Sequence, residues 1–259
     1  MILRGLGAWM NTVVYRGVPC KDFYNNLKQL REWHDGEVIL STWHNVEVDE
    51  SMIDEVVRSE DPGEDTDIGN PSLRFAKRQI IAANNGVLKA KGKKVLLTRT
   101  DILHKHNLFN LVNGDNNSSP YGIFSDRLVV GSVMSIDPES NLGPENERLY
   151  RICDWFQWGH KEDLIKFTNV LEELPKYKQT GCCLEQVWFL SCYNKYCKNK
   201  LDVYNITNHK KECWKIIVEN FNIIDSVGLN TGKWKNKTQE EIYISEQKYR
   251  EYYERLSIL

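Results

Sequence analysis

The sequence lacks any long hydrophobic run. None of its stretches approaches the roughly 18 consecutive apolar residues that a transmembrane helix requires. The start, MILRGLGAWMNTVVYRG, has no continuous apolar segment, so we expect no secretory signal. An excess of one charge is also lacking, with 34 Lys and Arg against 36 Asp and Glu. We therefore expect a cytoplasmic protein that binds no nucleic acid by bulk electrostatics, and peripheral association with the inner face of the membrane stays open.

Several familiar catalytic motifs are missing as well. Neither phosphate-binding glycine loop, G-x-x-x-x-G-K-[ST] or G-x-G-x-x-G, occurs at a predicted strand–helix junction. The nucleophile elbow G-x-S-x-G and the zinc motif H-E-x-x-H are also absent. These absences weigh against nucleotide-hydrolysing, dehydrogenase and hydrolase interpretations.

Cysteine is present in an odd number, seven, which favours reduced thiols over a disulfide framework. Cys192, Cys197, His209 and Cys213 form C-x4-C-x11-H-x3-C, a spacing close to that of structural zinc sites. However, Cys192 lies in an apolar helical run, and positions five apart on a helix diverge. The two cysteines would converge on a metal only if the helix ended between them. A zinc-stapled binding module therefore stays open as an alternative function.

The pattern of apolar residues predicts an α/β protein with a helical C-terminal part. We expect helices at 21–34 and from Pro71 or Ser72 to 91, and further helices near Lys161 and at 182–197, 209–219 and 238–256. Strands are predicted at 1–9, 36–43, around Val56, at 94–98 and within 126–137. This order predicts a mixed sheet flanked by helices in residues 1–180, with residues 181–259 as a helical extension packed on the same domain.

The strand predicted at 94–98 ends in Thr98-Arg99-Thr100-Asp101. In α/β sheets, loops at the carboxyl ends of strands commonly carry the chemistry. A guanidinium group offers a planar fork to phosphate oxygens, and a carboxylate can bind a divalent metal. The alternative interpretation, an ordinary surface ion pair or turn cap formed by Arg99 and Asp101, stays open.

A series of short motifs in a fixed order resembles the WavE family of lipopolysaccharide biosynthesis, which is treated as a family of glycosyltransferases. The resemblance spans about residues 36–190 and rests on Ser41-Thr42-Trp43, Asp61-Pro62-Gly63, Arg78-Gln79, Gly86, Arg99-Thr100-Asp101, Asp154-Trp155-Phe156, Gly159 and Glu185-Gln186. That family in turn is similar to GT-A nucleotide-sugar transferases. The resemblance implies a nucleotide-sugar donor and a glycan or glycolipid acceptor of lipopolysaccharide or capsule, while the oligomeric state stays open.

The resemblance also implies a divalent cation, Mg²⁺ or Mn²⁺. GT-A enzymes hold it with a D-x-D motif at the end of a strand, and here Arg99 replaces the first acid and leaves Asp101 as the metal ligand. Because the guanidinium group of Arg99 can itself neutralise phosphate, the metal is dispensable if Arg99 takes over its role. His104 or His106 would complete a metal shell, although such histidines are more often solvent-exposed.

The same resemblance assigns roles to other residues. For an inverting transfer we expect Glu185 as the catalytic base, with Asp154 as an alternative base or acceptor ligand and Arg99 beside the leaving group. Donor contacts are expected from Thr42, Trp43, Asp61, Arg78, Gln79 and Thr100. Trp155, Phe156 and Trp158 would stack on the acceptor sugar, although they and Trp43 fit core packing equally well. A nucleotidyl- or phosphotransferase on the same scaffold is the alternative enzyme.

Overall fold

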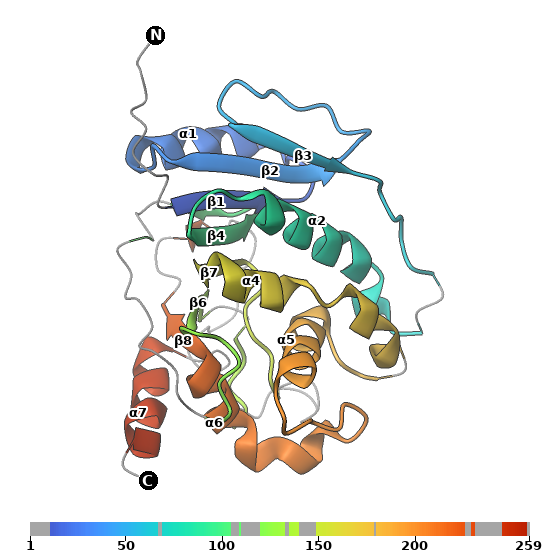
Figure 1. Ribbon diagram of the computed structural model, residues 1–259, viewed down its shortest axis with the longest axis vertical. Helices are drawn as coiled ribbons and strands as arrows, with labels where there is room; N and C mark the ends of the chain where they lie inside the picture. The colour runs from blue at the N-terminus through green and yellow to red at the C-terminus, as the bar shows by residue number, and fades with distance from the viewer. Residues whose placement is uncertain are drawn as a thin grey trace.

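The computed structural model describes residues 11–66, 69–104, 109, 120–132, 135–139, 149–178, 180–225, 229–230 and 245–257. Within these residues the chain forms a seven-stranded sheet with the strand order β3-β2-β1-β4-β7-β6-β8. Helices lie on both faces of this sheet (Figure 1). The expected mixed sheet flanked by helices is confirmed.

One half of the sheet is parallel and is built from the first four strands, β1 (Asn11–Arg16), β2 (Glu37–Trp43), β3 (Glu55–Ser59) and β4 (Lys94–Arg99). Helix α1 (Phe23–Trp33) connects β1 to β2, and the short η1 (Pro71–Leu73) and α2 (Ala76–Lys89) lie between β3 and β4. The strand expected at 1–9 falls outside the described residues. The β-branched and aromatic run Thr12-Val13-Val14-Tyr15 forms most of β1, the first strand of the described residues.

The other half of the sheet is mixed. Strand β7 (Phe156–His160) runs antiparallel to both β4 and β6 (Leu128–Gly131), and β8 (Phe221–Ile224) is parallel to β6. Strands β5 (Leu103–His104) and β9 (Leu229–Asn230) form a separate two-stranded sheet. Strand β8 directly follows a helix and was not predicted from the sequence.

The later helices agree with the predicted ranges. They are α4 (Lys161–Thr168), α5 (Leu184–Tyr196), α6 (Lys210–Asn220) and α7 (Glu246–Ser257), with the short 3₁₀ helices η3 (Leu171–Tyr177) and η4 (Ile206–His209) between them. Residues 238–244, the start of the last predicted helix, lie outside the described residues. In the part of the chain that the structure covers, no helix combines the length and the apolar character needed to cross a membrane.

Alternating side chains of the parallel strands enter two separate cores. On one face, Val13 and Tyr15 pack with α1; on the other, Val14 packs with α2 and with the cluster that includes α4 and α5. Gly86 brings α2 close to the sheet, because a Cβ at this position would lie 2.5 Å from Val14 Cγ1. Helix α2 is therefore fixed against β1, and its first turn lies near the strand ends.

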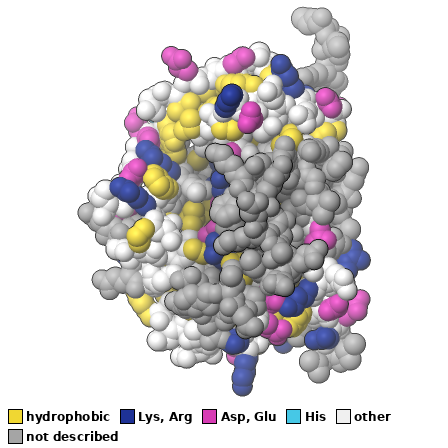
Figure 2. Space-filling model, turned by 180° about the vertical axis from the view of Figure 1, so that it is seen from behind, with side chains coloured by type: hydrophobic (Ala, Val, Ile, Leu, Met, Phe, Trp, Pro, Cys, Tyr) yellow, Lys and Arg dark blue, Asp and Glu magenta, His cyan; other side chains and the backbone are white. Residues whose placement is uncertain are grey.

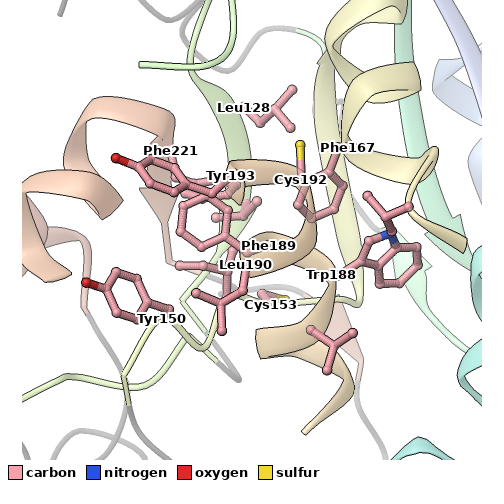
Figure 3. Packing of buried hydrophobic residues seen from close by; sticks show 14 of the residues in the cluster. Leu128, Tyr150, Cys153, Phe167, Trp188, Phe189, Leu190, Cys192, Tyr193 and Phe221 are labelled. Atoms are coloured by element: carbon pink, nitrogen blue, oxygen red, sulfur yellow. The ribbon is translucent and has the colours of Figure 1, made fainter. Parts of the chain in front are cut away.

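Helix α5 is buried on both sides. Figure 3 shows Phe189 on one side of the helix and Trp188 on the other. Phe189 meets Phe221 of β8 with ring centroids 4.7 Å apart, whereas Trp188 stacks on Phe167 of α4 at 5.7 Å. Aromatic rings from both sides of residue 180 thus share one core, and the division of the chain at that point stays a prediction.

Charged side chains of both signs are interspersed on the face that Figure 2 shows, among the residues that are coloured there. This mixture agrees with the near-zero formal net charge of −2. On this face the coloured side chains form no broad basic surface of the kind that binds nucleic acid through bulk electrostatics.

Candidate functional site

The strand order places a crevice at the carboxyl ends of β1 and β4. From β1 the chain proceeds to β2 and β3 on one side, and then returns to place β4 on the other side of β1. In open α/β sheets, ligands bind at such a switch in direction. A cavity of about 460 Å³ lies at these strand ends and at the start of α2, where its lining includes Arg16, Trp43, Asp61, Arg78, Arg99 and Asp101. Its volume lies in the usual range for small-molecule sites.

Two arginines stand side by side at this switch point. Arg16 ends β1, Arg99 ends β4, and they are direct partners in the parallel register. The carboxylate of Asp154 lies between them, with its Oδ2 3.2 Å from Arg16 Nη2 and 3.7 Å from Arg99 Nη1. Adjacent like charges repel, and the buried Asp154 offsets this repulsion.

Arg16 is buried and held from three directions. Its Nη1 donates to Gln79 Oε1, its Nη2 donates to the backbone oxygen of Asp154, and its guanidinium carbon lies 4.8 Å from the centre of the Trp188 ring. Its Nε is buried and has no hydrogen-bond partner among the described residues. Burial lowers the pKa of Arg16, against the charge of Asp154. The chain thus holds a partly unsatisfied cation at the wall of the cavity.

Arg99 and Asp101 form a two-point ion pair at the cavity wall. Arg99 Nε donates to Asp101 Oδ1 at 2.9 Å and Nη2 donates to Oδ2 at 2.6 Å. Burial acts to lower the pKa of Arg99, but the hydrogen bonds to Asp101 and the charge of Asp154 outweigh it, so the pKa is raised. The side chains remain 32% and 47% exposed, so the pair is open to solvent. The ion pair of the alternative interpretation is therefore present, and both of its residues line the cavity.

Arg78 and Asp61 form a second two-point pair across the cavity. Arg78 Nε and Nη2 each donate to one carboxylate oxygen of Asp61 at 2.6 Å. The hydrogen bond from Arg78 lowers the pKa of Asp61, which also accepts from the backbone nitrogen of Gly63 at 2.9 Å. Phe75 lies beside this pair, with its ring centre 5.8 Å from the Arg78 guanidinium carbon, and its side chain is exposed at the cavity.

Of the remaining residues predicted to contact the donor, three line the cavity and one is buried in the sheet. Trp43, Gln79 and Thr100 line the cavity, whereas Thr42 is buried in β2 and is not part of the lining. Strand alternation explains the difference, because Thr42 and Trp43 point to opposite faces of the sheet. Gly17, with φ of 105°, makes the turn after β1 that an L side chain would strain.

Glu185, the predicted base, is not part of the cavity lining. It lies in the first turn of α5, and its Oε1 is 3.4 Å from Arg151 Nη2. The predicted acceptor residues Trp155, Phe156 and Trp158 are also outside the lining, and their side chains are buried in the two cores. The structure therefore does not bring these four side chains to the cavity, and their catalytic or acceptor roles stay predictions.

The residues present do not offer a divalent cation the ligand set it prefers. Mg²⁺ and Mn²⁺ bind oxygen ligands, which at phosphate-binding sites are one or two free carboxylates together with water and substrate phosphates. Both oxygens of Asp101 accept from Arg99, both of Asp61 accept from Arg78, and Asp154 faces two arginines. Among the described residues no group of three or more His, Cys, Asp or Glu is arranged to hold a metal.

The histidines and cysteines considered above as metal ligands make other contacts where the structure describes them. His104 is buried, and its Nε2 lies 2.8 Å from Thr98 Oγ1; His106 lies outside the described residues. Two thiols of the alternative zinc set have different partners: Cys192 donates to Lys166 O, and Cys213 accepts from the backbone nitrogen of Tyr150. These contacts do not favour the zinc-stapled module.

Arg16 and Phe75 are among the cavity-lining residues that were not predicted from the sequence. The signal for Arg16 was present, because NTVVYRG repeats the pattern of KVLLTRT, in which a buried strand ends in arginine. The strand had been expected at 1–9, so Arg16 was not placed at a strand end. Phe75 carries no comparable signal, because one exposed aromatic residue before a helix is common.

Several solved glycosyltransferase structures are similar to this chain at low identity. They include the pneumococcal glycosyltransferase GlyE from Streptococcus pneumoniae TIGR4 (10% identity, TM-score 0.39, 74% of this chain and 45% of that chain), so the match spans less than half of that protein. The galactosyltransferase LgtC in complex with donor and acceptor sugar analogs matches at 14% identity and TM-score 0.41, with 73% of this chain and 72% of that chain covered. A glycosyltransferase involved in glycosylation of the major capsid of PBCV-1 matches at 11% identity and TM-score 0.33, with 65% and 67% covered.

These TM-scores are low, so the assignment of a family does not depend on them. A search of curated proteins finds no match. A family model described as WavE lipopolysaccharide synthesis matches residues 23–255, which is most of the chain and includes nearly every element described above. The chain belongs to the WavE lipopolysaccharide-synthesis family.

Proposed function

We propose that this protein is a glycosyltransferase that takes a nucleotide-sugar donor at the carboxyl ends of β1–β4 and transfers the sugar to a growing surface glycan. Membership of a lipopolysaccharide-synthesis family supports the substrate class. The observation that carries the proposal is the pair Arg16 and Arg99, adjacent in register at the switch point and facing a cavity. Guanidinium pairs of this kind suit phosphate oxygens.

Different residues of the cavity suit different parts of a nucleotide-sugar donor. The diphosphate would lie against Arg16 and Arg99, because these are the cations at the strand ends. The exposed ring of Phe75 offers an apolar face to the nucleoside, and the largely buried Trp43 also lines the cavity. Gln79, fixed by Arg16, would help to orient the donor.

The transfer itself requires charge compensation at the diphosphate. The bond between the anomeric carbon and the β-phosphate oxygen breaks, and its electron pair stays on that oxygen. A bond forms between the anomeric carbon and the acceptor oxygen, whose proton leaves to a base. The released nucleoside diphosphate carries one more negative charge than it did in the donor, so cations at this position favour the transition state.

The base and the stereochemical outcome are finer parts of the proposal. Glu185 remains the predicted base of an inverting transfer, and Asp154 the alternative. Asp154 makes its contacts with Arg16 and Arg99, which favours a positioning role for it. The anomeric configuration of the product, read by nuclear magnetic resonance, decides between inversion and retention, and Glu185→Gln tests the base.

A divalent metal at Asp101 was expected from the family resemblance, and the ligand set described above does not fit it. We therefore derive no step through a metal. Action in the cytoplasm and association with the inner face of the membrane stay predictions, to be tested by fractionation of cells that express the chain.

A panel of UDP-, GDP-, CMP- and dTDP-sugars tests the function. We expect one class of donor to bind and, with a suitable glycan or glycolipid acceptor, to release the nucleoside diphosphate, or the monophosphate if the donor is a CMP-sugar. Release of pyrophosphate would instead indicate the alternative nucleotidyltransferase. If folded protein binds none of these donors, with or without Mn²⁺, the proposed function is wrong.

A further inference from the structure

We propose that the donor diphosphate is neutralised by the guanidinium groups of Arg16 and Arg99 without a divalent cation, and that Asp101 is a built-in counter-ion which the phosphate displaces from Arg99. This inference rests on the proposed function and concerns how the same cavity holds the leaving group. Three structural observations carry it: the register of the arginines, the different settings of two aspartates, and the occupied carboxylates.

The register of β1 and β4 fixes the two cations next to each other. Arg16 and Arg99 are direct partners at the ends of parallel strands, and the same buried carboxylate, Asp154, lies near both. Arg16 cannot move away, because Gln79, Asp154 and the Trp188 ring surround it. Its buried Nε lacks a partner among the described residues, and Arg16 is one of the residues that line the cavity, so its positive charge lies next to the space that an anion would occupy.

The two aspartates near Arg99 differ in how firmly they are held. The side chain of Asp154 is 5% exposed and serves both arginines, so its loss would leave buried cations unmatched. The side chain of Asp101 is 47% exposed and is two residues from Arg99 in the chain. An exposed ion pair contributes little to stability, so Asp101 can turn into solvent at small cost.

The geometry of the Arg99–Asp101 pair is the geometry that a phosphate would adopt. Arg99 Nε and Nη2 point in parallel at two oxygens, at 2.9 Å and 2.6 Å. Two oxygens of a phosphate group can take the same positions. The carboxylate therefore keeps the fork of Arg99 extended toward the cavity before the donor arrives, and the more highly charged phosphate replaces it.

The other carboxylate of the cavity is also engaged. Asp61 accepts from Arg78 through both oxygens, which leaves its pair intact and away from a metal role. A metal site would require at least one of these aspartates to give up its arginine to bind a second cation. Binding of an anion in place of Asp101 requires no new cation and leaves Arg16 and Asp154 unchanged.

Titration calorimetry in the presence of a chelator tests the metal-free part. The probes are UDP, GDP and dTDP, each compared with its monophosphate. We expect one nucleoside diphosphate to bind at least about tenfold more tightly than its monophosphate in EDTA, with less than about a threefold change on addition of Mn²⁺. Binding that requires Mn²⁺ or Mg²⁺ would overturn the proposal.

Substitution of Asp101 gives opposite results under the two interpretations. If Asp101 is a displaced counter-ion, Asp101→Asn binds the diphosphate as tightly as the wild type or up to about tenfold more tightly, because the competing charge is gone. If Asp101 holds a metal, the same variant loses diphosphate affinity. Arg99→Gln should remove the preference for diphosphate over monophosphate, and a retained preference counts against the inference.

A matched control separates local effects from general ones. Arg74→Gln breaks another exposed pair, with Glu64 at 2.6 Å, next to η1 and outside the cavity lining, and should leave diphosphate binding unchanged. Failure of the inference is distinguishable from failure of the function: metal-dependent binding and turnover overturn only the inference. Absence of binding by every nucleotide and nucleotide sugar overturns both.

Discussion

The two ends of the same strands carry buried charge in different ways. At the amino ends of β1 and β2, Glu37 is fully buried and accepts hydrogen bonds from Thr12 Oγ1 at 2.7 Å and the Lys91 backbone nitrogen at 2.8 Å. The Lys91 ammonium lies 3.2 Å from its other oxygen. One carboxylate is thus met by a cation, a hydroxyl and an amide of the same chain.

At the carboxyl ends, two cations share one buried acid. Arg16 and Arg99 lie on either side of Asp154, the second acid Asp101 is half-exposed, and a cavity opens beside them. Buried charge therefore serves stability where an opposite charge and neutral hydrogen-bond donors of the same chain lie against it. Where cations are grouped beside a cavity and left partly unsatisfied, they indicate a binding site for an anion.

The largest effect is expected from a substitution at the carboxyl end of β4. Arg99→Ala should lower kcat/KM for donor turnover by about 100- to 1,000-fold, because it removes a charged donor from the leaving group. The melting temperature should change by only a few degrees, because the pair with Asp101 is exposed and contributes about 0–1 kcal/mol. Rates of nucleotide release check this, and a variant within about tenfold of wild type would contradict it.

A substitution at the amino ends of the strands should lower stability and leave nucleotide binding unchanged. Glu37→Gln should lower the free energy of unfolding by about 1–3 kcal/mol, because buried donors lose a charged acceptor, while nucleotide affinity stays unchanged. Urea denaturation and calorimetry measure the two effects. Glu55→Gln is the matched control, since its side chain is 32% exposed and lies 3.6 Å from the same lysine, and we expect little loss of stability. Loss of nucleotide affinity in Glu37→Gln would break the distinction between the two ends.

A third prediction concerns His104, a buried histidine near the carboxyl end of β4 whose Nε2 lies beside the Thr98 hydroxyl. Burial lowers the pKa of His104 from 6.5 to about 3, and its Nδ1 has no hydrogen-bond partner among the described residues. Between these pH values the unfolded chain binds the proton and the folded chain does not, so stability falls as the pH decreases below about 6.5. The slope from this one group approaches about 1.4 kcal/mol per pH unit.

His104→Gln should therefore reduce the acid-side loss of stability, measured as the difference in unfolding free energy between pH 6.5 and 5. His44→Gln is the control, because the His44 side chain is exposed. Equal pH slopes in wild type and His104→Gln would show that His104 is not the group responsible.

The smallest expected effect concerns the nucleoside. Phe75→Ala should weaken nucleotide binding by about two- to tenfold, which corresponds to about 0.5–1.5 kcal/mol for one aromatic contact. Leu88→Ala removes a similarly exposed side chain at the other end of α2, outside the cavity lining, and should have no effect. Equal affinities of the two variants would place the nucleoside elsewhere in the site.

The parallel half of the sheet could be predicted because its strands are continuous apolar runs. EVILSTW and KVLLTR are buried on both faces, and such runs are visible in sequence. Strand β8, with only four residues directly after a helix, gives too short a pattern. The strand predicted at 1–9 lies outside the described residues, and the β-branched run that follows it and forms β1 belongs to no predicted element.

The candidate site was harder to predict, for physical reasons. The pairing of Arg16 with Arg99 depends on strand order and register, which bring residues 83 positions apart into contact only in the folded sheet. The aromatic residues Trp155, Phe156 and Trp158 fit both sugar stacking and core packing, and only burial distinguishes the two. Arg99 and Asp101 could be predicted because the end of the strand predicted at 94–98 and the position of the D-x-D motif coincide in one short segment.

The most direct test is a crystal structure of the protein with the nucleoside diphosphate that binds best, grown in the presence of Mn²⁺. Our account predicts β-phosphate oxygens within hydrogen-bond distance of the Arg16 and Arg99 guanidinium groups, with the Asp101 side chain turned toward solvent. A nucleotide bound away from the ends of β1 and β4, or a phosphate held by a manganese ion on Asp101, would contradict it.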